Sequence, residues 1–207
     1  MTGLLICTAL GIEARALREG LTPTTDGVEV IRMGMGPGNA ASAFPLLADA
    51  EALAVAGFGG ALDEGLRPGD VVVAEEVRFD GRVLPCPSAP FVAEELAGAG
   101  LPVRTGALVT SGHLVTGAER GRLAARGALA VDMESGPVAA AAGGRPFAAV
   151  RVIVDTPAAP LLHPATLLGG VRALRTLRHV GRALARWALG LGGQPEQCPP
   201  PEEVRST

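Results

Sequence analysis

The chain has 207 residues, of which 48% are hydrophobic, and a net charge of −3 at pH 7. This length suits one α/β domain with a sizeable core, and the charge excludes a general attraction to nucleic acid. The N-terminal residues lack the charged region and cleavage site of a signal peptide, and no apolar run reaches the roughly 18–20 residues of a membrane span. The three widely spaced cysteines form no metal or disulfide pattern, so we expect no metal, no cofactor and a cytoplasmic location.

Short apolar runs alternate with segments of helical periodicity along the chain. The runs that predict strands are Leu4–Leu10, Val28–Met33, Leu53–Phe58, Asp70–Val77, Gly106–Thr110, Ala128–Val131 and Phe147–Val154. Helices are predicted over Ile12–Arg18, an Ala-rich stretch from Ala40 to about Ala50, Phe91–Ala97, Ala118–Ala125 and Met133–Ala142, and a loop over Arg82–Ala89. This alternation predicts a single-domain, three-layer αβα fold with a mostly parallel mixed sheet and helices on both faces.

The C-terminal part divides into a helix and a tail. Residues 167–191 carry apolar side chains at helical spacing, and beside them runs a row of arginines: Arg172, Arg175, Arg178, Arg182 and Arg186. Such a helix either packs its apolar face on the sheet or lies on an anionic membrane surface as a peripheral contact. Residues 192–207 are rich in Pro and Glu and are expected to form a disordered tail, so the folded domain is expected to span residues 1–191.

Two carboxylates follow predicted strands in the second half of the chain. Glu134 belongs to the run Val-Asp-Met-Glu at residues 131–134, and Asp155 ends the run Arg-Val-Ile-Val-Asp at residues 151–155. Ligands of open α/β sheets bind at the carboxyl ends of the strands. Two acids that converge there could have different roles in one reaction, because one can bind the hydroxyls of a sugar while the other protonates a leaving group.

Five segments occur in a characteristic order: residues 8–14, 57–62, 67–72, 131–135 and 151–155. Together they resemble the purine nucleoside phosphorylases and nucleosidases, most closely the branch that holds methylthioadenosine/S-adenosylhomocysteine nucleosidase. The resemblance covers about residues 4–156. Within that superfamily, the Val-Asp-Met-Glu-Ser run, the short chain and the Arg-rich C-terminal helix resemble the hopanoid-associated phosphorylases, which are thought to remove adenine from adenosylhopane.

The resemblance implies a role for each matched side chain. Asp155 matches the acid that protonates or hydrogen-bonds the purine at N7, and Glu134 matches the glutamate that binds the ribose 2′- and 3′-hydroxyls. Met133 matches the methionine that packs under the sugar, and Glu13 matches the acid that positions or deprotonates the attacking water. Taken alone, the three acids also fit structural roles, as a cap after a strand for Asp155 and as acids at helix starts for Glu134 and Glu13.

Other matched positions act through the main chain. Gly36, in the glycine turn of residues 34–38, matches a turn that contacts phosphate in the phosphorylases, where glycine lets N–H groups approach an anion. Val115 and Thr116 match positions whose backbone reads the edge of adenine. Phe58 and Gly59 belong to the segment near the nucleophile.

Two departures from the family pattern leave alternatives open. Val154 stands where a Ser usually precedes the catalytic Asp, and Phe58 stands where a Ser or Thr is common. The resemblance implies an enzyme that cleaves the N-glycosidic bond of a 5′-modified adenosine, a small-molecule nucleoside, and releases adenine. Inorganic phosphate is a second substrate if the reaction is phosphorolysis. Glu13 and the lack of a matching phosphate-binding Arg favour water instead. The alternatives on the same fold are a methylthioadenosine/S-adenosylhomocysteine nucleosidase, a futalosine-type nucleosidase and a non-catalytic nucleoside-binding protein.

The 5′ side of the predicted pocket is expected to be open. The segment Phe79–Pro102 is shorter than in the methylthioadenosine nucleosidases, so the flap over this side is expected to be trimmed. Together with the basic C-terminal helix, this suggests a bulky, lipid-like 5′ group such as a hopanoid, presented at a membrane surface. A homodimer is the expected assembly.

Overall fold

The structure is a computed structural model that describes residues 2–22, 25, 27–156 and 164–191; the predicted tail at 192–207 lies outside these residues. The strands are β1 (Thr2–Thr8), β2 (Val28–Arg32), β3 (Ala50–Ala61), β4 (Val71–Phe79), β5 (Arg82–Pro85), β6 (Val103–Thr110), β7 (Ala128–Asp132) and β8 (Phe147–Asp155). The helices are α1 (Gly11–Gly20), α2 (Pro37–Ser42), α3 (Phe44–Leu47), α4 (Ala89–Gly98), α5 (Gly117–Ala124), α6 (Ser135–Ala142) and α7 (Pro164–Leu191).

All eight strands of the described residues belong to one sheet. Its main path runs β2-β1-β3-β7-β6-β4-β5, and β8 pairs in parallel with β3 and antiparallel with β4. Because β7 pairs with both β3 and β6, and β6 with β4, the strands β3, β8, β4, β6 and β7 close into a ring. Most strand pairs are parallel, so the predicted mostly parallel mixed sheet is confirmed.

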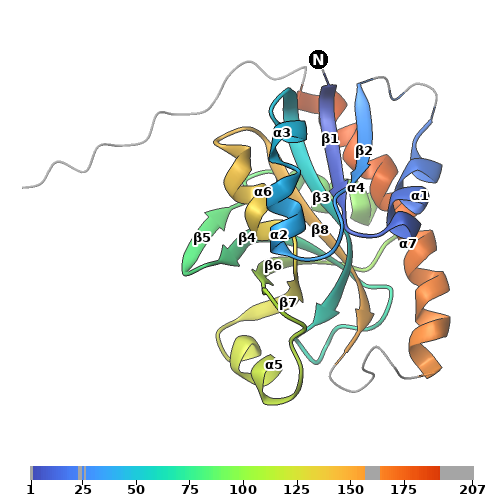
Figure 1. Ribbon diagram of the computed structural model, residues 1–207. Helices are drawn as coiled ribbons and strands as arrows, with labels where there is room; N and C mark the ends of the chain where they lie inside the picture. Colours follow the sequence, from blue (N-terminus) through green and yellow to red (C-terminus); the bar gives the residue numbers. More distant parts are fainter. Residues whose placement is uncertain (1, 23–24, 26, 157–163, 192–207) are drawn as a thin grey trace, which may run out of the picture.

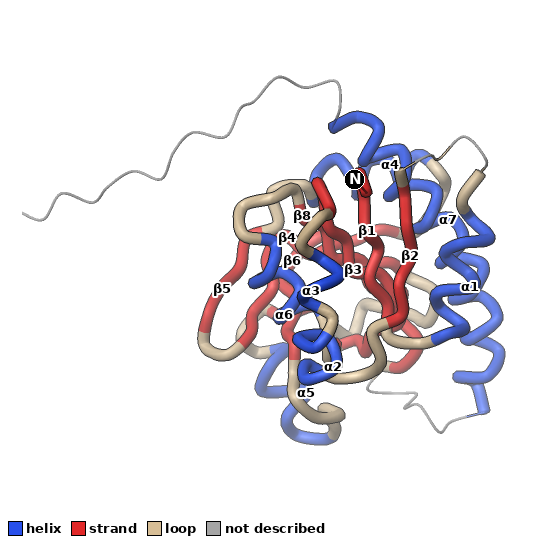
Figure 2. The backbone as a smooth tube through the Cα atoms, turned by 45° about the horizontal axis from the view of Figure 1, so that its top comes forward, coloured by secondary structure: helices blue, strands red, loops and turns tan. Residues whose placement is uncertain are grey.

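Helices cover both faces of this sheet, as Figure 1 and Figure 2 show. On one face α1, α4 and α7 bury Leu17, Val92 and Leu177 against the strands. On the other face α3 and α6 bury Leu47 and Val138. The predicted single-domain, three-layer αβα fold is therefore confirmed, and both layers of the core are built mainly from small and branched aliphatic side chains.

The Ala-rich stretch after the glycine turn does not form one helix up to Ala50, as the sequence pattern predicts. It breaks at Ala43 into the short helices α2 and α3, and β3 already begins at Ala50. Pro45 lies in the first turn of α3, where its missing N–H costs no hydrogen bond. Pro is tolerated at a helix start but not in a helix interior, so this sequence favours two short helices.

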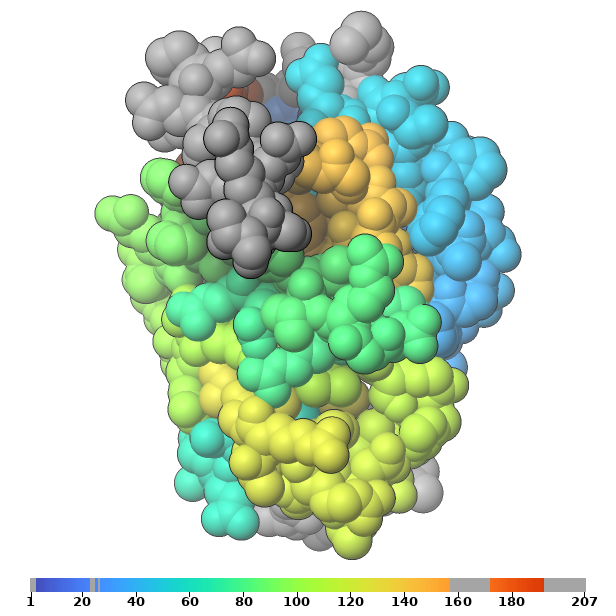
Figure 3. Space-filling view, turned by 90° about the vertical axis from the view of Figure 1, so that its left-hand side faces the viewer, coloured from blue at the N-terminus to red at the C-terminus, as the bar shows by residue number. Residues whose placement is uncertain are grey.

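The predicted loop Arg82–Ala89 contains a strand. β5 pairs with the end of β4 through the turn Asp80–Gly81. The φ angles of these two residues are 50° and 72°, which is the left-handed geometry that a two-residue hairpin turn requires. In Figure 3 this hairpin, drawn in green, lies between α6 above it and the α5 region below it. The hairpin thus ends the sheet at β5, its edge strand.

The C-terminal helix α7 packs its apolar face into the core. The most buried of its described large side chains are Leu177, Val180, Leu184 and Trp187. The interpretation in which this apolar face meets a bilayer is therefore wrong, because these side chains already contact the sheet and α1. Arg178 and Arg186, on the outer side, form ion pairs with Glu19 and Glu95. Among the described residues, none of the helices has the length and apolar character to span a membrane.

Candidate active site

The predicted acidic residues each lie at the carboxyl end of a strand, namely β1, β7 and β8. Glu13 lies in the first turn of α1, directly after β1; Glu134 is the N-cap of α6, after β7; and Asp155 ends β8. All three are buried, with exposed fractions of 2%, 5% and 4%. A buried carboxylate requires hydrogen-bond or charge partners, so the partners of each acid define the site.

Glu13 is held by four donors and is not an exposed helix-start acid. Its Oε2 accepts hydrogen bonds from the Thr8 hydroxyl at 2.7 Å and from the main-chain N–H groups of Ala9 and Leu10 at 3.1 and 2.7 Å. Its Oε1 accepts from the N–H of Phe58 in β3 at 2.7 Å. Phe58 therefore contributes its main chain to the site, while its side chain packs against the core. These bonds fix the orientation of the carboxylate.

Arg151 is the cation at the centre of this region, and its side chain is fully buried within β8. Its Nε donates to Asp132 Oδ2 at 2.7 Å, and its Nη2 donates to Glu134 Oε2 at 3.4 Å and to the Ser135 hydroxyl at 3.1 Å. Its Nη1 has no hydrogen-bond partner. Burial disfavours the charged guanidinium, but the neighbouring carboxylates outweigh burial and raise the pKa of Arg151 above its usual value. Arg151 is therefore a fixed positive charge with an unused donor.

Glycines of β3 make room for these groups. A Cβ on Gly57 would lie 2.7 Å from Glu13 Oε1 and 2.9 Å from Arg151 Nη1, and a Cβ on Gly59 would lie 2.9 Å from Arg151 Cβ. The Glu13 carboxylate and the unused Arg151 donor therefore lie close to the same point above β3. Only glycine leaves that space open, which explains a Gly-rich segment inside a buried strand.

Glu134 joins the glycine turn to this cluster. Its Oε1 accepts a hydrogen bond of 2.9 Å from the N–H of Gly36, whose φ of 92° favours glycine. Burial raises the pKa of Glu134, and the charge of Arg151 opposes that rise only in part. The Gly36 N–H, which was expected to approach an anionic substrate, is thus already occupied by a carboxylate of the protein.

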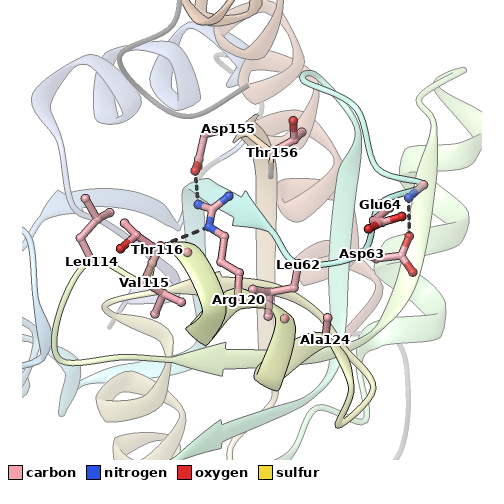
Figure 4. Close-up of a pocket in the computed structure, with 13 residues that line it drawn as sticks. Leu62, Asp63, Glu64, Leu114, Val115, Thr116, Arg120, Ala124, Asp155 and Thr156 are labelled. Atoms are coloured by element: carbon pink, nitrogen blue, oxygen red, sulfur yellow. Dashed lines mark hydrogen bonds and ion pairs between the residues drawn. The ribbon is translucent and has the colours of Figure 1, made fainter. Parts of the chain in front are cut away.

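Asp155 lies apart from this cluster and pairs with Arg120 of α5 (Figure 4). Arg120 Nε also donates to the Val115 carbonyl at 3.1 Å, and its Nη1 donates to the Ala61 carbonyl at 3.4 Å. Burial raises the pKa of the Asp155 carboxyl, and Arg120 opposes this rise. A Cβ on Gly60 would lie 2.8 Å from Arg120 Nη2, so β3 needs a glycine here as well.

Two cavities border the pair formed by Asp155 and Arg120. The larger, of about 960 Å³, lies between α5 and the end of β8 and is lined by Val115, Thr116, Arg120 and Asp155 among others. The smaller, of about 50 Å³, is also lined by Asp155 and Arg120 and reaches Met133. Asp155 thus faces the large cavity and also lies beside Met133, which precedes Glu134 in the chain.

The structure thus brings the predicted residues together in two groups, although their roles stay predictions. Glu13, Glu134, Gly36 and the main chain of Phe58 form one group, together with Gly59. Asp155, Val115 and Thr116 border the large cavity, and Met133 borders the small one.

Sequence reasoning missed the basic partners of the acids. The sequence pattern includes Arg151 only as part of a run and predicts no role for Arg120 or Asp132. A signal for Arg151 was present, because it is a charge inside an otherwise apolar run, and a buried charge must be paired. Arg120 gives no comparable signal, since an Arg in a short surface helix is ordinary.

Neither buried cysteine offers a nucleophile. Burial raises the pKa of Cys7 to about 12, and burial with the nearby Glu76 charge raises that of Cys86 to about 12. Both therefore stay protonated thiols at neutral pH. Within the described ranges, the His, Cys, Asp and Glu side chains do not gather in groups of three or more that could hold a metal ion.

Comparisons with known proteins agree with this architecture. The S-adenosylhomocysteine nucleosidase of Streptococcus pyogenes, in complex with 5-methylthiotubericidin, has a similar fold, with a TM-score of 0.72 and 20% identity over 88% of this chain and 97% of that chain. For the 5′-methylthioadenosine/S-adenosylhomocysteine nucleosidase of S. pneumoniae, the TM-score is 0.72 and the identity 20%, over 91% of this chain and 99% of that chain. For the futalosine hydrolase of Helicobacter pylori, the TM-score is 0.72 and the identity 16%, over 92% of this chain and 98% of that chain. At such identities the likeness concerns the fold.

The sequence itself supplies the family. No curated protein matches the chain at a significant level. The model of the phosphorylase superfamily, however, matches residues 19–186, which is well over half of the chain. The match includes β3, β7 and β8, the strands that carry Phe58 and Arg151 and precede Glu134. On this evidence the chain belongs to the phosphorylase superfamily.

Proposed function

We propose that this protein hydrolyses the N-glycosidic bond of an adenosine that carries a 5′ substituent, and releases adenine. The observation that carries the proposal is the cluster of Glu13, Arg151 and Glu134, in which an unpaired guanidinium donor lies beside two carboxylates. Membership of the phosphorylase superfamily and a fold shared with nucleosidases support this class of reaction. The names of those nucleosidases support an adenosine-type substrate.

In this proposal the attacking water binds between Glu13 and Arg151. Arg151 Nη1 donates a hydrogen bond to the water oxygen, and Glu13 Oε1 accepts a proton from it. The four donors around the Glu13 carboxylate keep it in position before the substrate arrives. A positioned general base of this kind contributes about 10²–10⁴-fold to the rate.

Glu134 and Met133 act on the sugar. A carboxylate is an acceptor only, so Glu134 can take hydrogen bonds from both the 2′- and the 3′-hydroxyl. Its charge also stabilises the positive, oxocarbenium-like sugar that develops as the bond breaks. Met133 borders the small cavity beside Asp155 and packs under the ring.

Asp155 acts on the leaving base. Adenine leaves as a poor anion unless a donor neutralises N7, and a carboxyl whose pKa is raised by burial carries a proton at higher pH than an exposed one. Asp155 therefore donates to N7 from the end of β8. The main chain of Val115 and Thr116, which line the same cavity, reads the other edge of the base.

The charges around the nucleophile favour water over phosphate. Asp132, Glu134 and Glu13 surround the guanidinium of Arg151, so negative charge is in excess there. A phosphate dianion placed there would be repelled by carboxylates in a low-dielectric interior. The Gly36 N–H, the other candidate phosphate donor, is occupied by Glu134.

Product analysis tests this function. The purified protein is incubated with adenosine, 5′-methylthioadenosine and a long-chain 5′-alkyl adenosine, each with and without phosphate, and adenine and the sugar product are separated by chromatography. Hydrolysis predicts free adenine and a free sugar under both conditions. A sugar 1-phosphate formed in the presence of phosphate would show that the reaction is phosphorolysis and not hydrolysis.

The same assay decides whether the protein is an enzyme and whether its activity belongs to this site. Adenine release that is lost in Glu13→Gln but kept in Glu29→Gln, an exposed acid of β2, would assign the activity to this site. If no member of the panel is cleaved although adenosine binds, the protein is a nucleoside-binding member of the superfamily. The long-chain substrate tests whether the site accepts a bulky 5′ group. The segment expected to cover this group is short, since only a two-residue turn joins β4 to β5.

A further inference from the structure

Asp132 is a buried carboxylate beside the proposed site that has no part in the steps described above. It ends β7, two residues before Glu134, and its side chain is 1% exposed although the residue borders the small cavity. Its Oδ1 accepts the Thr110 hydroxyl at 2.6 Å, and its Oδ2 accepts Arg151 Nε at 2.7 Å and the Ser135 N–H at 3.1 Å. Both oxygens are therefore engaged by the protein, so a role for Asp132 lies in the groups that it holds.

The charge of Arg151 is shared unequally between its acidic neighbours. Asp132 receives both Nε and Nη2 of the guanidinium, whereas Glu134 receives only Nη2, at 3.4 Å. Such a two-nitrogen contact fixes the plane of the guanidinium, and with it the position of Nη1, which has no partner. Asp132 is therefore the main counter-ion of Arg151, and the longer contact leaves the Glu134 carboxylate able to accept other donors.

The neighbouring elements hold Asp132 itself in place. Thr110, at the end of β6, donates its hydroxyl to Asp132 and accepts the N–H of Gly136 at 2.8 Å. Ser135 and Gly136 begin α6, and the first N–H groups of a helix have no partner within it. The carboxylate and the Thr110 hydroxyl supply those partners. The end of β6, the end of β7 and the start of α6 thus converge on one side chain, which in turn orients Arg151 of β8.

We propose that Asp132 is a positioning residue that neutralises Arg151, so that Nη1 stays aimed at the attacking water and Glu134 stays available for the sugar hydroxyls. Without the charge of Asp132, Glu134 becomes the counter-ion of Arg151, and the guanidinium turns toward it. This role rests on the proposed function, which places the water and the sugar. A purely structural role, as a partner for the start of α6, predicts lower stability without a change in the ionisation of Glu134.

The ionisation of Glu134 tests this arrangement in the free protein. Burial raises the pKa of Glu134, the charge of Arg151 opposes that rise, and the charge of Asp132 adds to it. In Asp132→Asn the repulsion is lost and Arg151 turns to Glu134, so both changes should lower the pKa of Glu134. Carbon-13 NMR titration of the side-chain carboxyls measures this shift, with Glu134→Gln to assign the signal. Asp132→Glu keeps the charge and should stay close to the wild type, and the exposed Asp49→Asn is the control.

Steady-state kinetics with the best substrate of the panel test the consequence for the reaction. Asp132→Asn should lower kcat by at least about tenfold, because a small misplacement of a reacting group can cost about 10²-fold. Its KM should rise, since Glu134 is then engaged by Arg151. Thr110→Val keeps the charge of Asp132 but removes its hydroxyl partner, and should lie between Asp132→Asn and the wild type. Free adenine, measured by calorimetry, should bind to every variant as to the wild type.

The outcomes separate this role from the proposed function. An unchanged Glu134 titration in Asp132→Asn, or wild-type kcat and KM, overturns the role and leaves the function intact. Equal losses of adenine and nucleoside binding, with a lower unfolding temperature, reduce Asp132 to a structural partner of α6. If the wild type cleaves no nucleoside, the proposed function fails, and the Glu134 titration still decides whether Asp132 is the counter-ion that leaves Glu134 free. Should Asp132→Asn not fold, Thr110→Val decides, because wild-type kcat and KM in that variant would overturn the role.

Discussion

The Glu13 carboxylate accepts a hydrogen bond of 2.7 Å from the main-chain N–H of Phe58, 45 residues further along the chain. This bond ties the first turn of α1 to β3 and holds Oε1 close to the space above Gly57, where the unused donor of Arg151 lies. The position of the proposed base thus depends on a main-chain group. That explains how Phe58 can replace a hydroxyl side chain without releasing Glu13.

Glu13→Gln should lower kcat by about 10²–10⁴-fold, because an amide cannot take a proton from water. The substrate KM should change little, since Glu13 is proposed to contact the nucleophile and not the nucleoside. Steady-state kinetics with the best substrate of the panel measures both constants. Glu29→Gln, in the exposed part of β2, is the matched control. A variant that retains wild-type kcat would remove Glu13 from the mechanism.

Glu134→Gln should lower the binding affinity for nucleosides by about tenfold or more, because a hydrogen bond to a charged group is worth about 1.5–3 kcal/mol. Free adenine should bind almost as before. Calorimetric titration with adenosine and with adenine separates the two effects. Equal losses for both ligands would mean that Glu134 acts through the fold, for instance through Gly36 and Arg151.

Asp155→Asn should keep the fold and nucleoside binding but lose most of the turnover. Asparagine retains the shape of the side chain and lacks the acidic proton, and general-acid help is worth about 10²–10⁴-fold. Thermal unfolding and single-turnover kinetics, with the exposed Asp49→Asn as control, make the comparison. Turnover within about threefold of wild type would exclude Asp155 as the acid.

The pH profile should report the environment of Asp155. Burial raises the pKa of this carboxyl from its usual 3.8, and Arg120 lowers it. The protonated form is the proposed donor, so kcat should fall as the pH rises through the raised pKa. Removal of the Arg120 charge should move this fall to higher pH. A shift to lower pH in Arg120→Met would contradict the assignment, and Arg122→Met should leave the profile unchanged.

Gly181→Ala should destabilise the fold by about 1–3 kcal/mol, because it overpacks a helix contact. A Cβ at this position of α7 would overlap the Leu17 carbonyl oxygen of α1. Gly190→Ala, in the same helix with no atom within 4 Å of the new Cβ, is the matched control. That change should be neutral or stabilise by up to about 1 kcal/mol, as expected from helix propensity. Chemical denaturation measures both variants, and equal effects would show that the α1–α7 contact can relax.

Local sequence patterns determined most of the fold. Alternating apolar runs and helical periodicity predicted the layers, and the carboxylates that follow strands singled out Glu134 and Asp155. The pattern could not foresee that β7 runs antiparallel to β3 while β8 runs parallel to it. The pattern failed at Ala43 and at Asp80, where a proline and a left-handed turn changed the local path of the chain. Such features depend on single residues and are averaged out in a periodicity.

Only the tertiary structure decided how the acids are paired. Arg151 meets Asp132 and Glu134, and Arg120 meets Asp155, across separations of 17 to 35 residues. The bond from the Phe58 N–H to Glu13 involves a main-chain group that every residue except proline possesses, so no residue type signals it. Burial makes these pairings obligatory, because an isolated charge in the interior is far more costly than a paired one. The need for partners could be foreseen from the chain, but their identity follows from which strands the closed sheet brings side by side.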